Sequence, residues 1–167
     1  MSQRNYAGVN IVISPHGIYL FAKWLAIMSS APAGSAIQDA TGSDASPMDT
    51  IALIREGVST DVLDQIKDAL DLTDVELARV VRIPKRTLTR RKKDGVLRPD
   101  ESERALRLFR LVRHAEAVFG TTKDACAWMH TPNMALGDES PLQFADTEPG
   151  ARRVNQLLGQ IEHGVSL

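Results

Sequence analysis

Residues 73 to 95 read TDVELARVVRIPKRTLTRRKKDG, and this stretch predicts two short helices joined by a tight turn. Thr73 followed by Glu76 is the pattern of a capping box, in which each side chain satisfies a free backbone donor at the start of a helix. The proline at position 84 fixes its own backbone and moves the preceding residue out of the helical region. The first helix is therefore expected to end near residues 81–82, ahead of a sharp turn.

The second helix is expected to begin near Lys85, and its one strongly apolar residue is Leu88. That side chain should pack on Leu77, Ala78 and Ile83, so the other faces of the helix meet solvent or a partner. These outward faces carry Lys85, Arg86, Thr87, Thr89, Arg90, Arg91, Lys92 and Lys93, and all of them except Arg91 are the predicted DNA contacts. A supporting helix followed by such a basic helix describes a helix-turn-helix, whose second helix enters the major groove.

Positive charge is concentrated around this second helix. Between Arg79 and Arg98 there are nine basic residues and one acidic residue, Asp94, a local charge of +8. The whole chain carries -1, so the remainder sums to -9. Localised basic charge is expected of a surface that binds DNA phosphates. A basic helix that only faces solvent is the alternative, but the cap, the break and the single inward leucine together favour DNA binding.

The composition is that of a helical globular protein. Of the 167 residues, 43% are hydrophobic, 25% are charged and only 5% are aromatic, which predicts an all-α fold. A single cysteine, Cys126, excludes an internal disulfide framework and favours a reducing compartment, so we expect a cytoplasmic location. The apolar segment Val9–Met28 is interrupted at residues 14–17 and at Lys23, so neither a membrane span nor a secretion signal is expected.

The pattern predicts three parts. Residues 1–48 form an N-terminal extension and linker, whose apolar segment is too small to bury itself and is expected to self-associate or to dock on the main domain. Residues 49–119 form the helix-turn-helix domain. Residues 120–167 contain too few apolar groups for a core of their own, so they are expected to dock on the preceding domain and to present a surface to another molecule.

A long helix from Pro99 to Phe119, ended by Gly120, is expected to close the second part. Its arginines recur every three residues, at 104, 107, 110 and 113. Added phosphate contacts are one alternative for them, but a solvated face on which they pair with Glu101 and Glu103 is the expected role. Beyond it, a helix from Thr122 to Met129, a series of closely spaced turns and a last helix from Ala151 to Ile161 are expected.

Catalysis finds little support in this sequence. Cys126 and His130 are four residues apart on one predicted helix and could form a thiolate-imidazole dyad, but no third group is placed to orient the histidine. The remaining histidines are isolated, so a metal site lacks ligands, and no glycine-rich phosphate loop is present. We therefore expect neither an enzyme nor a cofactor.

A set of short motifs, in this order and spacing, resembles one known family. They are Arg55-Glu56-Gly57, Thr87-Leu88-Thr89-Arg90-Arg91, Val118-Phe119-Gly120, Ala127-Trp128, Thr131-Pro132-Asn133, Leu136-Gly137, Ser140-Pro141-Leu142, Thr147-Glu148-Pro149-Gly150 and His163-Gly164-Val165. The family is that of the Xre/MbcA/ParS antitoxins, the partners of RES-domain toxins in type II toxin-antitoxin systems, and the resemblance spans roughly residues 51–165. Arg82 and Arg91 depart from it, since many helix-turn-helix proteins place a glycine in the turn and an apolar residue is common at the position of Arg91. So does Asp138, where the family often has a second glycine.

The resemblance implies an Xre-like DNA-binding domain, a small helical toxin-binding domain, and a partner toxin that consumes NAD and whose cleft the antitoxin shields. The toxin contacts that it implies are Trp128, Pro132, Asn133, Leu136, Gly137, Pro141, Leu142, Gly150, His163, Gly164 and Val165. The leading hypothesis is thus an antitoxin that also binds its own operator, as a homodimer or higher assembly. The alternative is a helix-turn-helix transcriptional regulator whose C-terminal domain senses a small ligand and has no toxin partner.

Overall fold

The computed structural model describes residues 46–164, and within that range the regular structure is helical, as the composition predicts. In chain order the elements are α3 (Pro47–Glu56), α4 (Asp61–Ala69), α5 (Asp74–Val80), α6 (Lys85–Asp94), α7 (Pro99–Phe119), α8 (Thr122–His130), the 3-10 turn η1 (Met134–Leu136), α9 (Pro141–Phe144) and α10 (Glu148–Glu162). Residues 1–45, with the apolar segment expected to self-associate, and Val165 lie outside the described residues.

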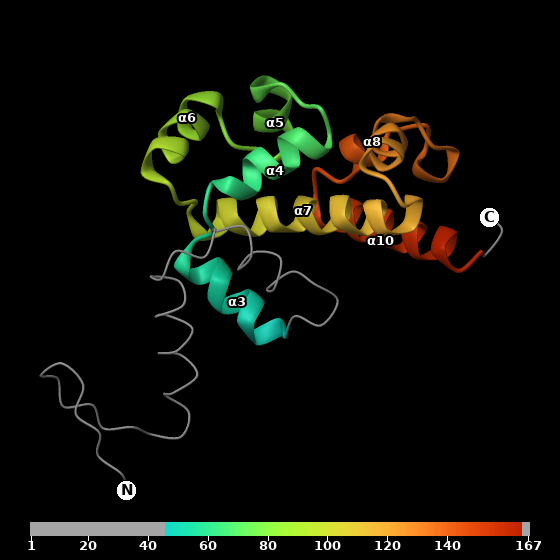
Figure 1. Cartoon of the computed structure of the whole chain (residues 1–167), viewed down its shortest axis with the longest axis horizontal. Coiled ribbons are helices and arrows are strands. Elements are labelled where there is room, and N and C mark those ends of the chain that lie inside the picture. Colours follow the sequence, from blue (N-terminus) through green and yellow to red (C-terminus); the bar gives the residue numbers. More distant parts are fainter. Residues whose placement is uncertain (1–45, 165–167) are drawn as a thin grey trace, which may run out of the picture.

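The 21-residue helix α7 runs through the middle of the molecule, and α3, α4, α8 and α10 all pack against it (Figure 1). One hydrophobic core extends along it, from Val58 and Val62 in the N-terminal part to Val154 and Leu158 on α10. The prediction that the C-terminal segment docks on the long helix is therefore confirmed. The domain boundary at residue 119 stays a prediction, and the core is continuous across it.

The helix-turn-helix forms as its sequence predicts. The backbone N–H of Glu76 donates to the Thr73 hydroxyl at 3.3 Å, and the Glu76 carboxylate accepts from the Thr73 backbone N–H at 2.8 Å, so the capping box is complete. Helix α5 ends at Val80, and Pro84 immediately precedes α6. Leu88 is 2% exposed and belongs to the core, as expected of the one inward apolar side chain of α6.

Two helices begin earlier than the apolar pattern predicts, and caps explain both differences. The Ser46 hydroxyl accepts from the backbone N–H of Met48, so α3 begins at Pro47, within a stretch that the sequence assigns to the linker. The Thr147 hydroxyl accepts from the backbone N–H of Gly150, so α10 begins at Glu148 rather than at residue 151. A proline in the first turn is compatible with each start, because its missing N–H would be unpaired there.

The arginines of α7 do not form one uniform solvated row. Arg107 pairs with Glu103 at 2.8 Å, as predicted, but Arg104 donates to the Val81 carbonyl at 3.0 Å and pairs with Asp100. Arg110 instead donates to the Thr50 hydroxyl of α3 at 2.8 Å. The expected pairing with Glu101 is wrong, because that carboxylate is buried under α6, and two of these arginines tie α7 to other elements.

Over the described range no helix combines the length and the apolar character that a membrane span needs.

Candidate functional site

Four basic side chains of α6 are free to meet a partner. Lys85, Arg86, Arg90 and Lys93 are exposed, and none forms a salt bridge with another residue of the described range. Thr89 is also exposed, but its hydroxyl donates to the Lys85 carbonyl at 3.0 Å and so turns back to its own helix. Free guanidinium and ammonium groups on an exposed helix can contact phosphates and guanine edges.

Lys92 differs from these four because acidic residues of two neighbouring helices hold it. Its Nζ lies 2.7 Å from a carboxylate oxygen of Asp64 on α4 and 3.8 Å from one of Asp74 on α5. A hydrogen bond from Lys67, and then the charges of Lys67 and Lys92, lower the pKa of Asp74, so that carboxylate stays ionised. A DNA phosphate would have to compete with these carboxylates for Lys92.

Arg91 points inward, which corrects its assignment to an outward face. Its Nε donates to Glu101 on α7 at 2.6 Å, and the side chains of the pair are only 9% and 7% exposed. Glu101 also accepts from the backbone N–H of Arg98, so its carboxylate is well satisfied. That hydrogen bond to Glu101 raises the pKa of Arg91. The pair fixes the C-terminal half of α6, the second helix of the helix-turn-helix and hereafter the recognition helix, to α7.

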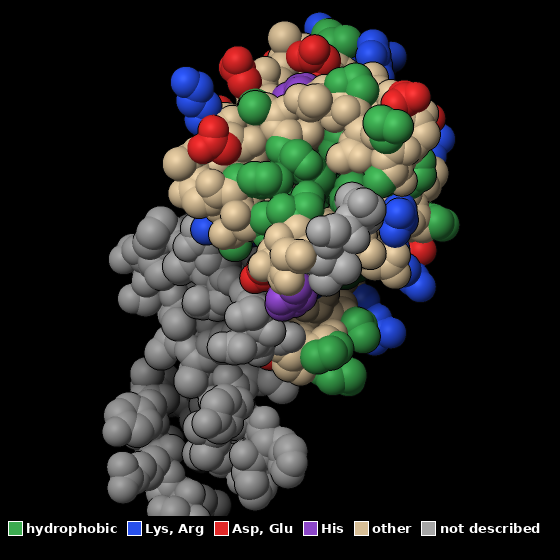
Figure 2. Space-filling view, turned by 90° about the vertical axis from the view of Figure 1, so that its right-hand side faces the viewer, with side chains coloured by type: hydrophobic (Ala, Val, Ile, Leu, Met, Phe, Trp, Pro, Cys, Tyr) green, Lys and Arg blue, Asp and Glu red, His purple; other side chains and the backbone are tan. Residues whose placement is uncertain are grey.

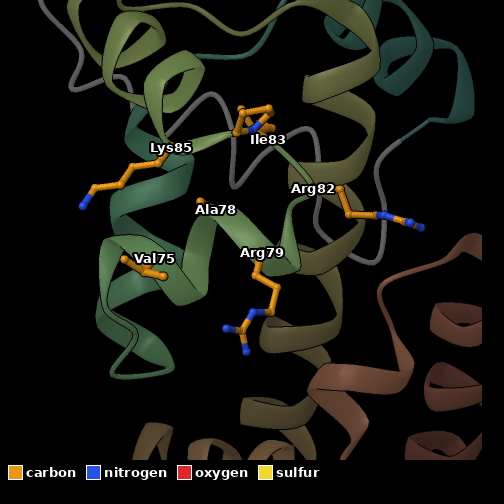
Figure 3. Close-up of a pocket in the computed structure, with 7 residues that line it drawn as sticks. Val75, Ala78, Arg79, Arg82, Ile83 and Lys85 are labelled. Carbon is orange, nitrogen blue, oxygen red and sulfur yellow. The ribbon is translucent and has the colours of Figure 1, made fainter.

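An open hollow of about 470 Å³ lies at the helix-turn-helix turn. Val75, Ala78 and Ile83 supply its apolar lining, while the side chains of Arg79, Arg82 and Lys85 extend outward around it (Figure 3). Arg79 and Arg82 are exposed and were not among the predicted DNA contacts. Their positions within the basic stretch from Arg79 to Arg98, which has a local charge of +8, could have identified them. Arg82 lies 3.8 Å from Asp146, which connects this turn to the C-terminal part.

The predicted toxin contacts separate into outward and inward residues. Those whose side chains or backbone are exposed are Pro132, Gly137, His163 and Gly164. Those that are buried are Leu136, Pro141, Leu142 and Gly150. Trp128 is half-buried and stacks in a tilted arrangement on Phe119, with 5.4 Å between ring centroids. Asn133 accepts from the backbone N–H of Ala135 and caps η1. The motif thus contains both structural positions and surface positions.

One exposed residue of this region was missed. Met134, on η1, is 88% exposed, the largest value among the exposed large hydrophobic side chains of the described residues. It lies within the motif-bearing stretch between Asn133 and Leu136, but spacing alone did not distinguish it from a core methionine. Figure 2 views the molecule from the end where α8 and the C-terminus lie, and hydrophobic side chains gather across the middle of that face.

The cysteine and histidine considered for catalysis are engaged elsewhere. A nitrogen of His130 lies 2.9 Å from the carbonyl oxygen of Leu70, in the turn after α4. Burial, with a smaller effect of the Asp71 charge, raises the pKa of the Cys126 thiol, which disfavours the thiolate that a nucleophile needs. Over residues 46–164, no three His, Cys, Asp or Glu side chains are grouped so as to hold a metal ion.

Comparisons with known proteins identify both parts. Residues 49–110 match the family described as the antitoxin Xre-like helix-turn-helix domain, and residues 114–164 match the antitoxin Xre/MbcA/ParS C-terminal toxin-binding domain. An "Antitoxin Xre" of Yersinia enterocolitica is 43% identical over 67% of this chain and 77% of that protein. Another, of Photorhabdus laumondii, is 35% identical over 68% of this chain and 78% of its own length.

A solved structure shares the fold. The crystal structure of the M. tuberculosis MbcT-MbcA toxin-antitoxin complex matches with a TM-score of 0.52 and 22% identity. The match covers 65% of this chain and 96% of that one. At this identity the likeness supports the arrangement of helices and nothing finer.

Proposed function

The chain belongs to the Xre/MbcA/ParS family of antitoxins, and from this premise we propose that it neutralises a cognate RES-domain toxin and represses its own operon. The C-terminal part binds the toxin and shields the cleft in which NAD is consumed. The helix-turn-helix binds operator DNA. The observation that carries the proposal is the presence in one chain of a toxin-binding domain and of a helix, α6, whose exposed cations form no salt bridge with any other residue of the range 46–164.

DNA binding follows from the chemistry of α6. Arg86 and Arg90 are exposed on α6, and an arginine side chain can donate bidentate hydrogen bonds to the O6 and N7 atoms of guanine. Arg79, Arg82 and Lys85 surround the hollow at the turn, where cations add affinity through phosphates without reading sequence. One helix-turn-helix reads only a few base pairs, so we propose that a dimer or higher assembly occupies two half-sites about 34 Å apart.

A mobility-shift titration with the operator tests the DNA-binding half of the proposal. Arg86→Ala and Arg90→Ala should each cost about 1 to 3 kcal/mol of specific binding if the side chain reads a base. Lys123→Ala removes an exposed positive charge from α8 and serves as the matched control. Equal affinity and sequence preference for wild type and the double arginine variant would contradict the assignment.

The toxin-binding half is tested by co-expression with a RES-domain toxin, sought first among the reading frames beside this gene. Cellular NAD should fall when the toxin is expressed alone and hold when this protein accompanies it, and the two proteins should co-purify. Continued loss of NAD in the presence of the folded protein would overturn the proposal.

A further inference from the structure

Met134 is exposed in a way that its surroundings do not explain. Within residues 114–164, Met134 and Ile161 are the large hydrophobic side chains left exposed, at 88% and 37%. Burying a methionine side chain is favourable, so an almost fully exposed one has most of its apolar area available for burial against a partner. Met134 follows Asn133, and the chain returns to the core two residues later at Leu136, which is 3% exposed.

The backbone that carries Met134 is held firmly. The Asn133 carbonyl accepts from the N–H groups of Leu136 and Asp138, and the Asn133 N–H donates to the Glu139 carbonyl at 3.1 Å. The Asn133 side chain accepts from the N–H of Ala135 at 2.9 Å. Buried Leu136 anchors this turn, so the exposure of Met134 belongs to a defined local structure and not to a frayed loop. A side chain presented from an ordered turn loses little backbone entropy when it binds.

We propose that Met134 is the apolar anchor of the toxin interface and inserts into an apolar recess on the toxin. This inference rests on the proposed function and adds the residue that carries the affinity. Interfaces concentrate their energy in a few side chains that fill pockets, and methionine adapts its shape to such a pocket. Asp138 and Glu139 are exposed beside the turn and form no salt bridge within residues 46–164, so the rim of the recess should be basic.

Calorimetric titration of the whole 167-residue chain with the RES-domain toxin that it protects against in the co-expression experiment tests the anchor. Met134→Ala should raise the dissociation constant at least tenfold, and Met134→Leu should restore most of the affinity because it keeps the apolar volume. Met48→Ala is the matched control, since Met48 is also a methionine and is 72% exposed, but lies on α3. Its dissociation constant should stay within twofold of wild type. Because both methionines are exposed, neither change should affect the thermal unfolding midpoint.

The possible outcomes distinguish a failure of the Met134 proposal from a failure of the proposed toxin binding. If wild type binds the toxin and Met134→Ala binds within twofold, the anchor is overturned while the proposed function stands. If wild type shows no binding, the proposed function fails and the anchor with it. A second copy of the chain is the other conceivable occupant. A loss of self-association by light scattering in Met134→Ala, with unchanged toxin affinity, would assign Met134 to that contact and overturn the inference.

Discussion

Asp71, Arg82 and Asp138 are the non-glycine residues of the described range that adopt a positive φ, at +49°, +53° and +64°. Aspartate tolerates this conformation better than most residues, because its short polar side chain can hydrogen-bond locally, whereas arginine has no such compensation. Arg82 stands where many helix-turn-helix proteins have glycine, and the structure shows why glycine suits the position. This chain therefore keeps a strained backbone at Arg82, and the arginine places a positive charge just before the recognition helix.

Arg82→Gly should be more stable than Arg82→Ala by about 1 kcal/mol, because both remove the side chain but only glycine adopts this φ without strain. Comparison of the two variants cancels the loss of the contact with Asp146. Urea unfolding monitored by circular dichroism measures the difference. An alanine variant as stable as the glycine variant would show that the turn carries no strain.

The capping box at Glu76 makes α5 sensitive to acid. Hydrogen bonds from the backbone N–H and the hydroxyl of Thr73 lower the pKa of Glu76. In the unfolded chain that carboxyl titrates near its ordinary value, about 4.3. Because the folded pKa is the lower one, the stabilisation is complete above about pH 5 and is lost as the pH falls through the depressed pKa.

Glu76→Gln keeps an acceptor at this position without a titrating group, so its stability should fall less steeply than that of wild type below about pH 5. Urea midpoints measured between pH 3 and 7 for both proteins test this. Parallel curves over that range would mean that the box contributes no pH dependence.

At the scale of the elements, local chemistry explains which helices were predictable. Thr73 and Pro84 precede the first residues of α5 and α6, and Gly95 and Gly120 follow the last residues of α6 and α7. These residues act on their own neighbours, so the sequence shows their effect. The starts of α3 and α10 were missed because the apolar pattern begins a turn after the cap. The inward position of Arg91 was missed although an apolar residue is common there, because charged residues are rarely buried and its partner Glu101 lies on another helix.

Helix α10 approaches the α9 turn so closely that a glycine is required at position 150. A Cβ there would lie 1.8 Å from the carbonyl oxygen of Phe144. The glycine that the resemblance assigns to toxin binding therefore also has a packing role, which sequence alone could not separate from recognition.

Gly150→Ala should destabilise the protein by about 3 kcal/mol or more, because the backbone of α9 or α10 must move to admit the methyl group. Gly159→Ala in the same helix is the control, since nothing lies within 4 Å of its Cβ position. That change should stabilise by about 0.5 to 1 kcal/mol through the helix preference of alanine. Thermal unfolding of both variants gives the comparison, and equal midpoints would refute the close approach.

At the scale of the whole molecule, the two proposed activities lie on separate surfaces of one core. The recognition helix packs on α5 and is fixed to the start of α7 through Glu101, whereas His163 and Gly164 are exposed beyond the end of α10. Deleting residues 163–167 should therefore weaken toxin neutralisation and leave operator binding intact. The Arg86→Ala and Arg90→Ala variant should lose operator binding and still protect against the toxin.

Cellular NAD after toxin expression and operator shift in vitro, measured for both variants, test this separation. Unfolding midpoints equal to that of wild type establish that each change is local. The assignment of the tail fails if the truncated protein preserves NAD as well as the full chain does.

Helix α7 also governs how hybrids between relatives can be made. Helices α3 and α4 of the N-terminal part and helices α8 and α10 of the C-terminal part all pack against it. A hybrid joined after Phe119 would pack the α8 and α10 of one parent on the α7 of the other, so side chains selected in different proteins would meet in one core. Operator preference should transfer with the few outward side chains of α6, leaving Leu88 and Arg91 in place. Toxin preference should transfer only when α7 is exchanged together with α8, α9 and α10.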